Sequence, residues 1–315
     1  MAWNMSKLKV CLCAPVHIQP SKKWIDALPD CDIIITDDSN GQIKIDRKNV
    51  RIYDYEKQKE KLGNLYKEFE KFHKSSACKN FGHWLAYNEG YDIILGIDSD
   101  CICPRDFIER HIEALQGEGC GWENPLKNVG FYPRGFPYSQ RNWEVAFNMG
   151  LWKNVLDING ADRNVAEPTD PKIKENNVVG GIIPLSGMNW ACKKEYIPYL
   201  FFLPNFDYKR LKFRRHDDIF GGYIFQKFLN KLKKSMTYGL PIVYHDTEID
   251  QEEDANAEMA MNTCDDEFYE LIDLAFSEIS PKSDMIRRFN PRFEGTKFEP
   301  LLESIKFWKK LYGKN

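Results

Sequence analysis

Two aspartates follow a continuous apolar stretch of the chain and are candidate ligands for a cation. The stretch Tyr91–Ile97 has the composition of a buried strand, and Asp98, Ser99 and Asp100 follow it directly. Because side chains alternate along a strand, we expect Asp98 and Asp100 to leave it on the same side, at the carboxyl edge of a parallel sheet. Two carboxylates there can hold Mg²⁺ or Mn²⁺, and such an ion can neutralise a diphosphate. An ordinary polar turn after a strand is the alternative interpretation.

Three further groups of polar residues are candidates for the same edge of the sheet. Asp37 and Asp38 end a second apolar stretch, where they can accept hydrogen bonds from a nucleobase or ribose or form an ordinary Asx turn. Asp217 and Asp218 follow a basic pair and precede a helix, so either can act as an acid–base or sugar-binding carboxylate or cap that helix. His245 ends a short apolar run, where its imidazole can complete a metal site or have a structural role.

An aromatic segment places cationic side chains among rings and turn residues. The segment 130–141 contains Arg134, Tyr138 and Arg141. Such a loop suits sugar stacking together with phosphate binding. Cation–π packing of arginine on aromatic rings would give the same pattern, so both interpretations stay open.

Composition and missing motifs exclude several classes of function. The chain has 315 residues, 44 Lys plus Arg against 47 Asp plus Glu, and nine cysteines without a CxxC pair. We therefore expect no nucleic-acid partner, and reduced thiols in place of disulfides or a zinc site. No apolar run reaches about 18 residues and no signal peptide is evident, which predicts a cytoplasmic protein without a transmembrane segment. ATPase, serine hydrolase, zincin and dehydrogenase motifs are absent.

The elements that position these residues alternate between strand and helix in the first half. Strands are predicted at 8–16, 31–36 and 91–97, and amphipathic helices at 62–72 and 107–115. Strands buried on both faces and separated by helices predict an α/β fold with a mostly parallel, doubly wound sheet.

The second half has a less regular pattern. The region 122–160 is expected to be loop and cleft wall, and 246–258 a solvated acidic loop. We predict one nucleotide-sugar-binding domain over residues 1–260 and a C-terminal helical extension over 261–315. Smaller expected elements are strands at 178–185 and 240–244 and helices at 219–233, 268–279 and 302–311.

Seven short stretches, in order along the chain, resemble the reversibly glycosylated polypeptides, a family that includes UDP-arabinopyranose mutases and is built on the GT-A glycosyltransferase fold. Together these stretches cover roughly residues 9–245. They are Ser76-Ala-Cys-Lys-Asn-Phe-Gly82, Ile97-Asp-Ser-Asp-Cys101, Gly135-Phe-Pro-Tyr-Ser-Gln-Arg141, Gly150-Leu-Trp152, Ser186-Gly-Met-Asn189, Arg215-His-Asp-Asp218 and Gly239-Leu-Pro-Ile-Val-Tyr-His245.

The resemblance implies a UDP-sugar substrate with Mn²⁺ or Mg²⁺. It implies that the Arg matching Arg141 undergoes reversible self-glycosylation, and since guanidinium stays protonated, a carboxylate such as Asp217 or Asp218 would have to activate it. This sequence departs from the family at Ser99, which replaces the middle acid of a triplet. The residue roles that follow are a metal site of Asp98, Asp100 and His245; a nucleotide site of Asp37, Asp38, Lys79, Asp98 and Ser99; a sugar site of Arg134, Tyr138, Gly187, Asn189 and Trp190; and catalysis by Arg141, Asp217 and Asp218.

Three functions are compatible with this resemblance. The first is an enzyme that cleaves the anomeric C–O bond of a UDP-sugar, as a mutase or a self-glycosylating protein does. The second is a glycosyltransferase that acts on an external glycan, lipid or protein. The third is a catalytically silent subunit of a hetero-oligomer, a hypothesis suggested by Ser99 in place of an acid. A homo-oligomer or a hetero-oligomer is possible in each case.

Overall fold

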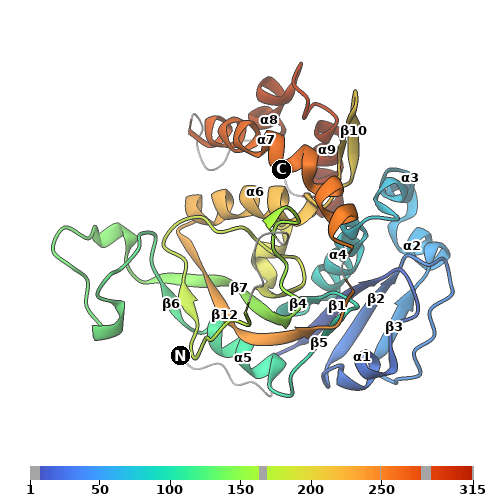
Figure 1. Ribbon diagram of the computed structural model, residues 1–315, viewed down its shortest axis with the longest axis horizontal. Coiled ribbons are helices and arrows are strands. Elements are labelled where there is room, and N and C mark those ends of the chain that lie inside the picture. Colours follow the sequence, from blue (N-terminus) through green and yellow to red (C-terminus); the bar gives the residue numbers. More distant parts are fainter. Residues whose placement is uncertain (1–7, 163–168, 249, 278–284, 314–315) are drawn as a thin grey trace.

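The chain folds around one large sheet with helices on both of its faces (Figure 1). The computed structural model describes residues 8–162, 169–248, 250–277 and 285–313. Within these residues the sheet has the strand order β3-β2-β1-β4-β9-β7-β12-β5, with β6 beside β7 and β8 beside β12. The long strands run in the same direction except β9, which is antiparallel to both of its neighbours. The expected α/β class with a mostly parallel sheet is confirmed.

The first half of the sheet matches the sequence pattern closely. The β-branched residues of its strands are buried on both faces, as in a sheet that is covered by helices on each side. Parallel pairing of β1 with β2 and β4 places the carboxyl ends of all three strands at one edge. The strands are β1 (Val10–Val16), β2 (Asp32–Asp37), β3 (Val50–Tyr53) and β4 (Ile93–Ile97).

In the region 122–160, expected to be loop and cleft wall, residues 143–154 form a long central strand, so the expectation is wrong for that stretch. β7 (Trp143–Asn154) pairs with β12 (Lys234–His245) and with β9 (Asn189–Lys193). Its polar Asn148 interrupts the apolar pattern, yet this side chain is buried and bonded to His111, Leu240 and Thr237. The expected strand 178–185 is reduced to β8 (Asn177–Val178). The other short strands are β5 (Cys101–Ile102), β6 (Glu118–Gly119), β10 (Phe206–Tyr208) and β11 (Leu211–Phe213).

The helices predicted to cover the sheet lie where the sequence pattern places them, but not all of them have the predicted length. The stripe expected as one helix over 62–72 is broken, because Gly63 has a φ of 54° and ends the first segment. The next segments are single turns. The helices are α1 (Lys22–Ala27), α2 (Tyr55–Leu62), α3 (Tyr66–Phe69), α4 (Asn80–Glu89), α5 (Phe107–Leu115) and α6 (Asp217–Lys231), with 3₁₀ turns at Gly63–Leu65, Glu70–Phe72, Ser76–Lys79, Lys127–Val129, Tyr138–Gln140 and Lys194–Tyr199.

The C-terminal helices are α7 (Gln251–Ser277), α8 (Met285–Phe293) and α9 (Leu301–Tyr312). The expected domain boundary after residue 260 falls inside α7, and the expected acidic loop 246–258 becomes helical from Gln251 onward. Aromatic side chains join these helices to the sheet layers: the rings of Phe220 and Phe268 stack 3.8 Å apart, and those of Phe201 and Trp308 4.8 Å apart. These helices therefore share a hydrophobic core with the sheet. None of the helices in the described part of the chain is long and apolar enough to cross a membrane.

Candidate functional site

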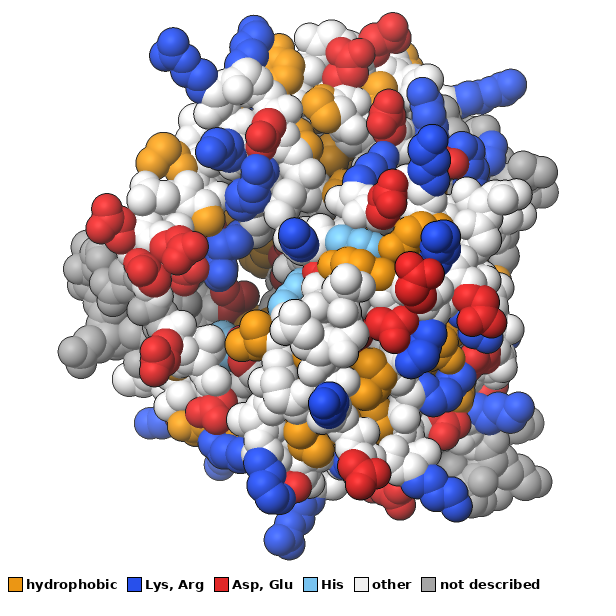
Figure 2. Space-filling view, turned by 90° about the vertical axis from the view of Figure 1, so that its right-hand side faces the viewer, with side chains coloured by type: hydrophobic (Ala, Val, Ile, Leu, Met, Phe, Trp, Pro, Cys, Tyr) orange, Lys and Arg blue, Asp and Glu red, His pale blue; other side chains and the backbone are white. Residues whose placement is uncertain are grey.

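A cavity of about 510 Å³ lies at the carboxyl edge of the parallel strands. The turn after β4, the end of β12, the segment after β7, the start of α6 and one side of α7 form its walls. Acidic side chains are visible inside a hollow of the molecular surface (Figure 2). Among the described residues, nine carboxylates line the cavity against two cations, Lys79 and Arg215. This excess of negative charge favours a cationic group in the cavity, such as a divalent ion.

Asp98 and Lys79 form an ion pair on one wall of the cavity. Lys79 ends the 3₁₀ turn Ser76–Lys79, and its buried Nζ lies 2.9 Å from Oδ1 of Asp98. Burial lowers the pKa of Lys79, but the carboxylates of Asp98, Asp217 and Asp218 outweigh that effect and raise it. Lys79 is therefore a fixed positive charge that faces the cavity.

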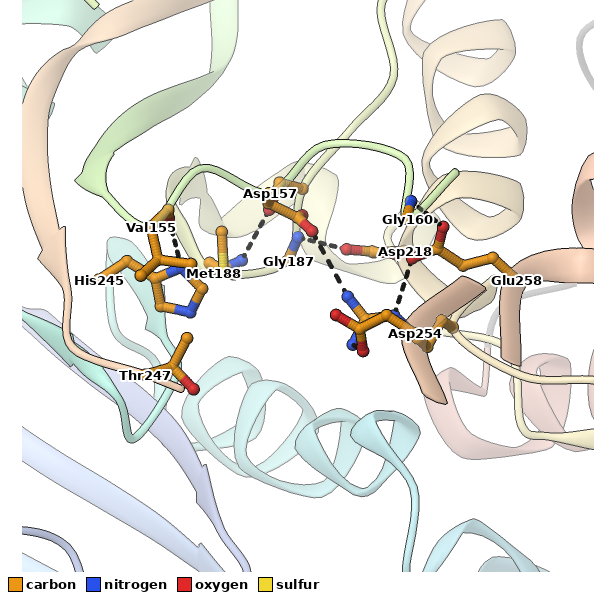
Figure 3. A network of polar contacts seen from close by, with 12 residues as sticks. Val155, Asp157, Gly160, Gly187, Met188, Asp218, His245, Thr247, Asp254 and Glu258 are labelled. Carbon is orange, nitrogen blue, oxygen red and sulfur yellow. Dashed lines mark hydrogen bonds and ion pairs between the residues drawn. The ribbon is translucent and has the colours of Figure 1, made fainter. Parts of the chain in front are cut away.

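Asp100 and His245 have the arrangement of metal ligands. Nδ1–H of His245 donates to the carbonyl oxygen of Val155 at 2.7 Å (Figure 3). Nε2 of His245 is therefore left to face Oδ2 of Asp100, at 3.4 Å. Ligand atoms of Asp100, Cys101 and His245 all lie within 4.8 Å of one another. Burial lowers the pKa of His245, but the hydrogen bond and charge of Asp100 raise it above the ordinary value. An imidazole nitrogen and a carboxylate oxygen suit Mn²⁺, so these residues fit such an ion.

Asp98 and Asp100 both line this cavity, although neither belongs to a strand. They flank Ser99 in the turn between β4 and β5, and β5 pairs with the end of β12 that carries His245. The tertiary pairing of β5 with β12 thus places His245 beside Asp100. The structure describes no hydrogen bond of the Ser99 side chain.

Asp217 and Asp218 begin α6, where the helix dipole favours negative charge. Asp218 accepts hydrogen bonds from the backbone N–H of Gly187 at 2.8 Å and of Ile219 at 2.9 Å, so both of its oxygens are engaged. Asp217 is more deeply buried. Burial is the main cause that raises the pKa of both carboxyls, and a neighbouring carboxylate raises each further, Asp218 for Asp217 and Asp157 for Asp218. Asp217 is thus the carboxyl better placed to carry a proton near neutral pH.

Arg215 is the centre of an ion cluster that the sequence pattern did not predict. Its guanidinium contacts Asp157 after β7 at 3.6 Å, and Asp254 and Glu258 of α7 at 3.1 Å each. Glu258 also accepts a hydrogen bond from the N–H of Gly160 (Figure 3). The cluster ties α7 to the segment after β7 across the cavity. The one sequence signal for this cluster is the spacing of Asp254 and Glu258, which are four residues apart. That spacing places both on one face only if the segment is helical, whereas 246–258 was expected to be a loop.

Asp37 and Asp38 lie at the same edge of the sheet but do not line the cavity. Asp37 accepts hydrogen bonds from the N–H groups of Ser39 and Gly41, so it forms an Asx turn, the structural alternative for this pair. Asp38 accepts hydrogen bonds from Lys74 and Tyr55 and pairs with His17 at 2.9 Å. Both carboxylates are occupied by protein donors, so direct binding of uridine by them is unsupported.

Two residues expected to bind the sugar are core residues instead, which corrects those expectations. Asn189 is fully buried in β9, where it bonds to His111, Leu151 and Pro241. Trp190 is also fully buried, and its ring covers Gly96. Gly187 lies next to the cavity residues, since a Cβ there would meet Nζ of Lys79 at 2.9 Å. Such a Cβ would also meet the ring of Phe202 at 2.9 Å, so any larger residue here would displace Lys79 and Phe202.

The aromatic segment lies at the opposite end of β7 from the cavity. Arg141 precedes the first residue of β7, whereas Val155, which lines the cavity, follows the last. A strand of twelve residues spans roughly 40 Å. Arg141 stacks on Tyr138 at 4.0 Å and donates to the carbonyl oxygen of Phe136 at 2.7 Å. Asp217 and Asp218 are thus not placed to activate Arg141 of the same chain, and the cation–π interpretation of this segment holds.

The site and the fold define a class of protein: an α/β protein with a carboxylate-lined cavity and metal-type ligands at the carboxyl edge of its sheet. A family model described as "Reversibly glycosylated polypeptide" matches residues 16–279, and the chain belongs to that family. No curated protein has a significantly similar sequence.

Solved structures of low sequence identity also resemble this chain. Glucosyl-3-phosphoglycerate synthase from Mycobacterium tuberculosis with Mn²⁺, uridine diphosphate and phosphoglyceric acid is 12% identical, with a TM-score of 0.46 over 87% of this chain and 80% of that chain. The same synthase with Mg²⁺ and uridine diphosphate is 13% identical, with a TM-score of 0.44 over 87% of this chain and 81% of that chain. These likenesses are distant, and the family membership is what bears on function.

Proposed function

We propose that this chain is a metal-dependent UDP-sugar enzyme of the GT-A type that cleaves the anomeric C–O bond of its substrate. The observation that carries the proposal is the convergence of Asp98, Asp100 and His245, from two distant parts of the sequence, on one cavity together with Lys79. Membership in the reversibly glycosylated polypeptide family supports the same class of substrate.

We assign a separate role to each group of charged residues in the cavity. Asp100 and His245 would hold Mn²⁺ or Mg²⁺, with Asp98 lining the same cavity, and the bound ion would supply positive charge for a leaving diphosphate. Lys79 adds a second, permanent cation on the same wall. Asp217 is the residue we assign to proton transfer or to stabilising a cationic sugar centre, while Asp218 holds the backbone of Gly187 in position.

A thermal-shift panel tests the substrate class. Nucleotides and nucleotide sugars are added to the protein with and without Mn²⁺, since a ligand of the folded state raises its melting temperature. We expect the largest shift for a uridine diphosphate compound together with Mn²⁺. Equal shifts for all nucleotides, or no dependence on Mn²⁺, would contradict the proposal.

The position of Arg141 favours a second candidate, transfer of the sugar to an external acceptor. Arg141 does not line the cavity of its own chain, so this position disfavours Arg141 as the acceptor and leaves a transferase to use an external one. The products distinguish the two: a UDP-sugar of changed ring size indicates a mutase, and UDP with a glycosylated acceptor indicates a transferase. Turnover by the purified chain alone would contradict a catalytically silent subunit. A cytoplasmic location stays a prediction.

A further inference from the structure

A loop opposite the cavity projects from the molecule and exposes apolar side chains. We call residues 122–141 the projecting loop; in Figure 1 its green ribbon extends away from the sheet at the left. Of the nine large apolar side chains that are most exposed in the described residues, five belong to this loop. Phe131 is 70% exposed and Tyr138 is 85% exposed. Such a concentration of exposed apolar side chains is typical of an interaction surface.

The projecting loop is also basic. It contains Lys127, Arg134 and Arg141 against the single acid Glu123. Arg134 is exposed, and the structure shows no ion pair for it within the described residues. Arginine beside exposed aromatic rings is the composition enriched in protein–protein interfaces. The loop therefore fits an acidic partner surface that also offers apolar contacts.

The outer face of α7 has the complementary properties. The helix has no Lys, Arg or His in its 27 residues, and three of its acids, Glu252, Asp266 and Glu270, are exposed on this face. Residues spaced three or four apart form one exposed row along it, which includes the exposed apolar side chains Met259 and Leu274. We call this row the outer stripe of α7: Glu252, Asn256, Met259, Thr263, Asp266, Glu270 and Leu274.

The projecting loop and the outer stripe are apart within one chain. Figure 1 shows the loop at the left and α7 at the top of the molecule. No hydrogen bond or ion pair joins the two among the residues that the structure describes. Complementary charge together with exposed apolar side chains is what a contact between two molecules needs. We propose that the projecting loop of one copy of this chain docks on the outer stripe of α7 of a second copy.

This contact joins two different surfaces, so it is heterologous and builds a ring or a chain of copies. The docked loop lies on the helix whose inner side lines the cavity through Asp254 and Glu258. Association thus brings the loop of one copy to the helix that walls the cavity of the next. The proposal does not depend on the proposed enzymatic function, because it is tested by association alone.

Sedimentation velocity of the full chain over a range of concentrations measures the association. We expect oligomers at about 0.05 M NaCl that dissociate at about 0.5 M NaCl, because salt screens the charge complementarity. Arg134→Glu alone and Glu270→Lys alone should each weaken association more than about tenfold, since each places like charges together. Phe131→Ser should weaken it through loss of apolar contact.

A mixture of the two charge variants gives the sharpest outcome. The acidic loop of the Arg134→Glu variant then faces the basic position on α7 of the Glu270→Lys variant, and the remaining loop and helix are native, so association should return. The controls Lys59→Glu and Glu60→Lys change exposed charges on α2 and should leave association unchanged. A monomer at every concentration, or an oligomer that survives both Arg134→Glu and Glu270→Lys, would overturn the proposal.

Discussion

An arginine lies near each end of β7, and the two arginines have different kinds of partner. At the carboxyl end, Arg215 is held by carboxylates from α7 and from the segment after β7, inside the wall of a cavity. At the amino end, Arg141 is held by the rings of Tyr132 and Tyr138 in a projecting loop. Both regions contain stretches that resemble the family, yet it is the carboxyl end that borders the cavity lined by carboxylates, Lys79 and His245. A motif therefore indicates chemistry only after its place in the fold is known.

The largest expected effect is at the carboxyl end. Asp100→Ala removes the carboxylate that faces His245, and we expect kcat/KM for a UDP-sugar to fall by about 10³-fold, since charge stabilisation of the leaving group is lost. UDP release measures the rate, and circular dichroism shows whether the fold is intact. Asp46→Ala, an exposed position outside the cavity, is the control. A folded Asp100→Ala protein with normal turnover would show that the site is assigned wrongly.

The ion cluster predicts a smaller effect on stability. Arg215→Gln leaves Glu258, which is buried, and Asp254 without their cation. We expect the free energy of unfolding to fall by about 2 kcal/mol, less than for a fully buried pair because the Arg215 side chain is 42% exposed. Urea unfolding measures it, with Arg210→Gln at an exposed position as the control. Equal losses for the two variants would mean that the cluster contributes nothing to stability.

The raised pKa of Asp217 predicts that its substitution stabilises the protein, in contrast to Arg215→Gln, and that this gain depends on pH. Folding raises the pKa of this carboxyl, so the folded state binds its proton more tightly than the unfolded state does. Its contribution to stability is therefore lost as pH rises from the ordinary aspartate pKa of about 3.9 through the raised pKa of the folded state. Asp217→Asn removes this penalty. We expect the variant to exceed the wild type by about 1–2 kcal/mol at pH 8 and the difference to vanish near pH 4, as measured by urea unfolding.

Asp218→Asn is the matched comparison for that experiment. Its two carboxylate oxygens accept hydrogen bonds from Gly187 and Ile219, and an amide can accept only through one oxygen atom. This variant should gain less stability than Asp217→Asn at pH 8, or lose some. A gain that is the same for both variants, or independent of pH, would contradict the separate roles proposed for the two aspartates.

The smallest expected effect is at the amino end of β7. Arg141→Ala removes the stacking on Tyr132 and Tyr138 and the hydrogen bond to Phe136, which together are worth about 1 kcal/mol. We expect a loss of that size in urea unfolding and faster limited proteolysis within the projecting loop. Arg134→Ala, an exposed arginine of the same loop, should change neither. A loss of several kcal/mol would show that Arg141 supports the core.

The amino-acid sequence alone determined the α/β class, the first parallel strands and the acidic turn after β4. These features depend on local periodicity, which is visible in a short window of residues. Local periodicity gave a wrong prediction for β7, because the hydrogen-bond partners of buried Asn148 are distant in the chain. It also gave a wrong prediction for the start of α7, because an acidic segment is typical of a solvated loop. Local pattern cannot show which polar residues acquire partners through packing.

Only the tertiary structure decided which polar groups meet. Pairing of β5 with β12 brings Asp100 to His245, and the packing of α7 brings Asp254 and Glu258 to Arg215. The length of β7 separates Arg141 from the cavity. Each of these outcomes joins residues that lie far apart in sequence, and such contacts depend on the whole arrangement of strands and helices, which no local spacing of residue types contains.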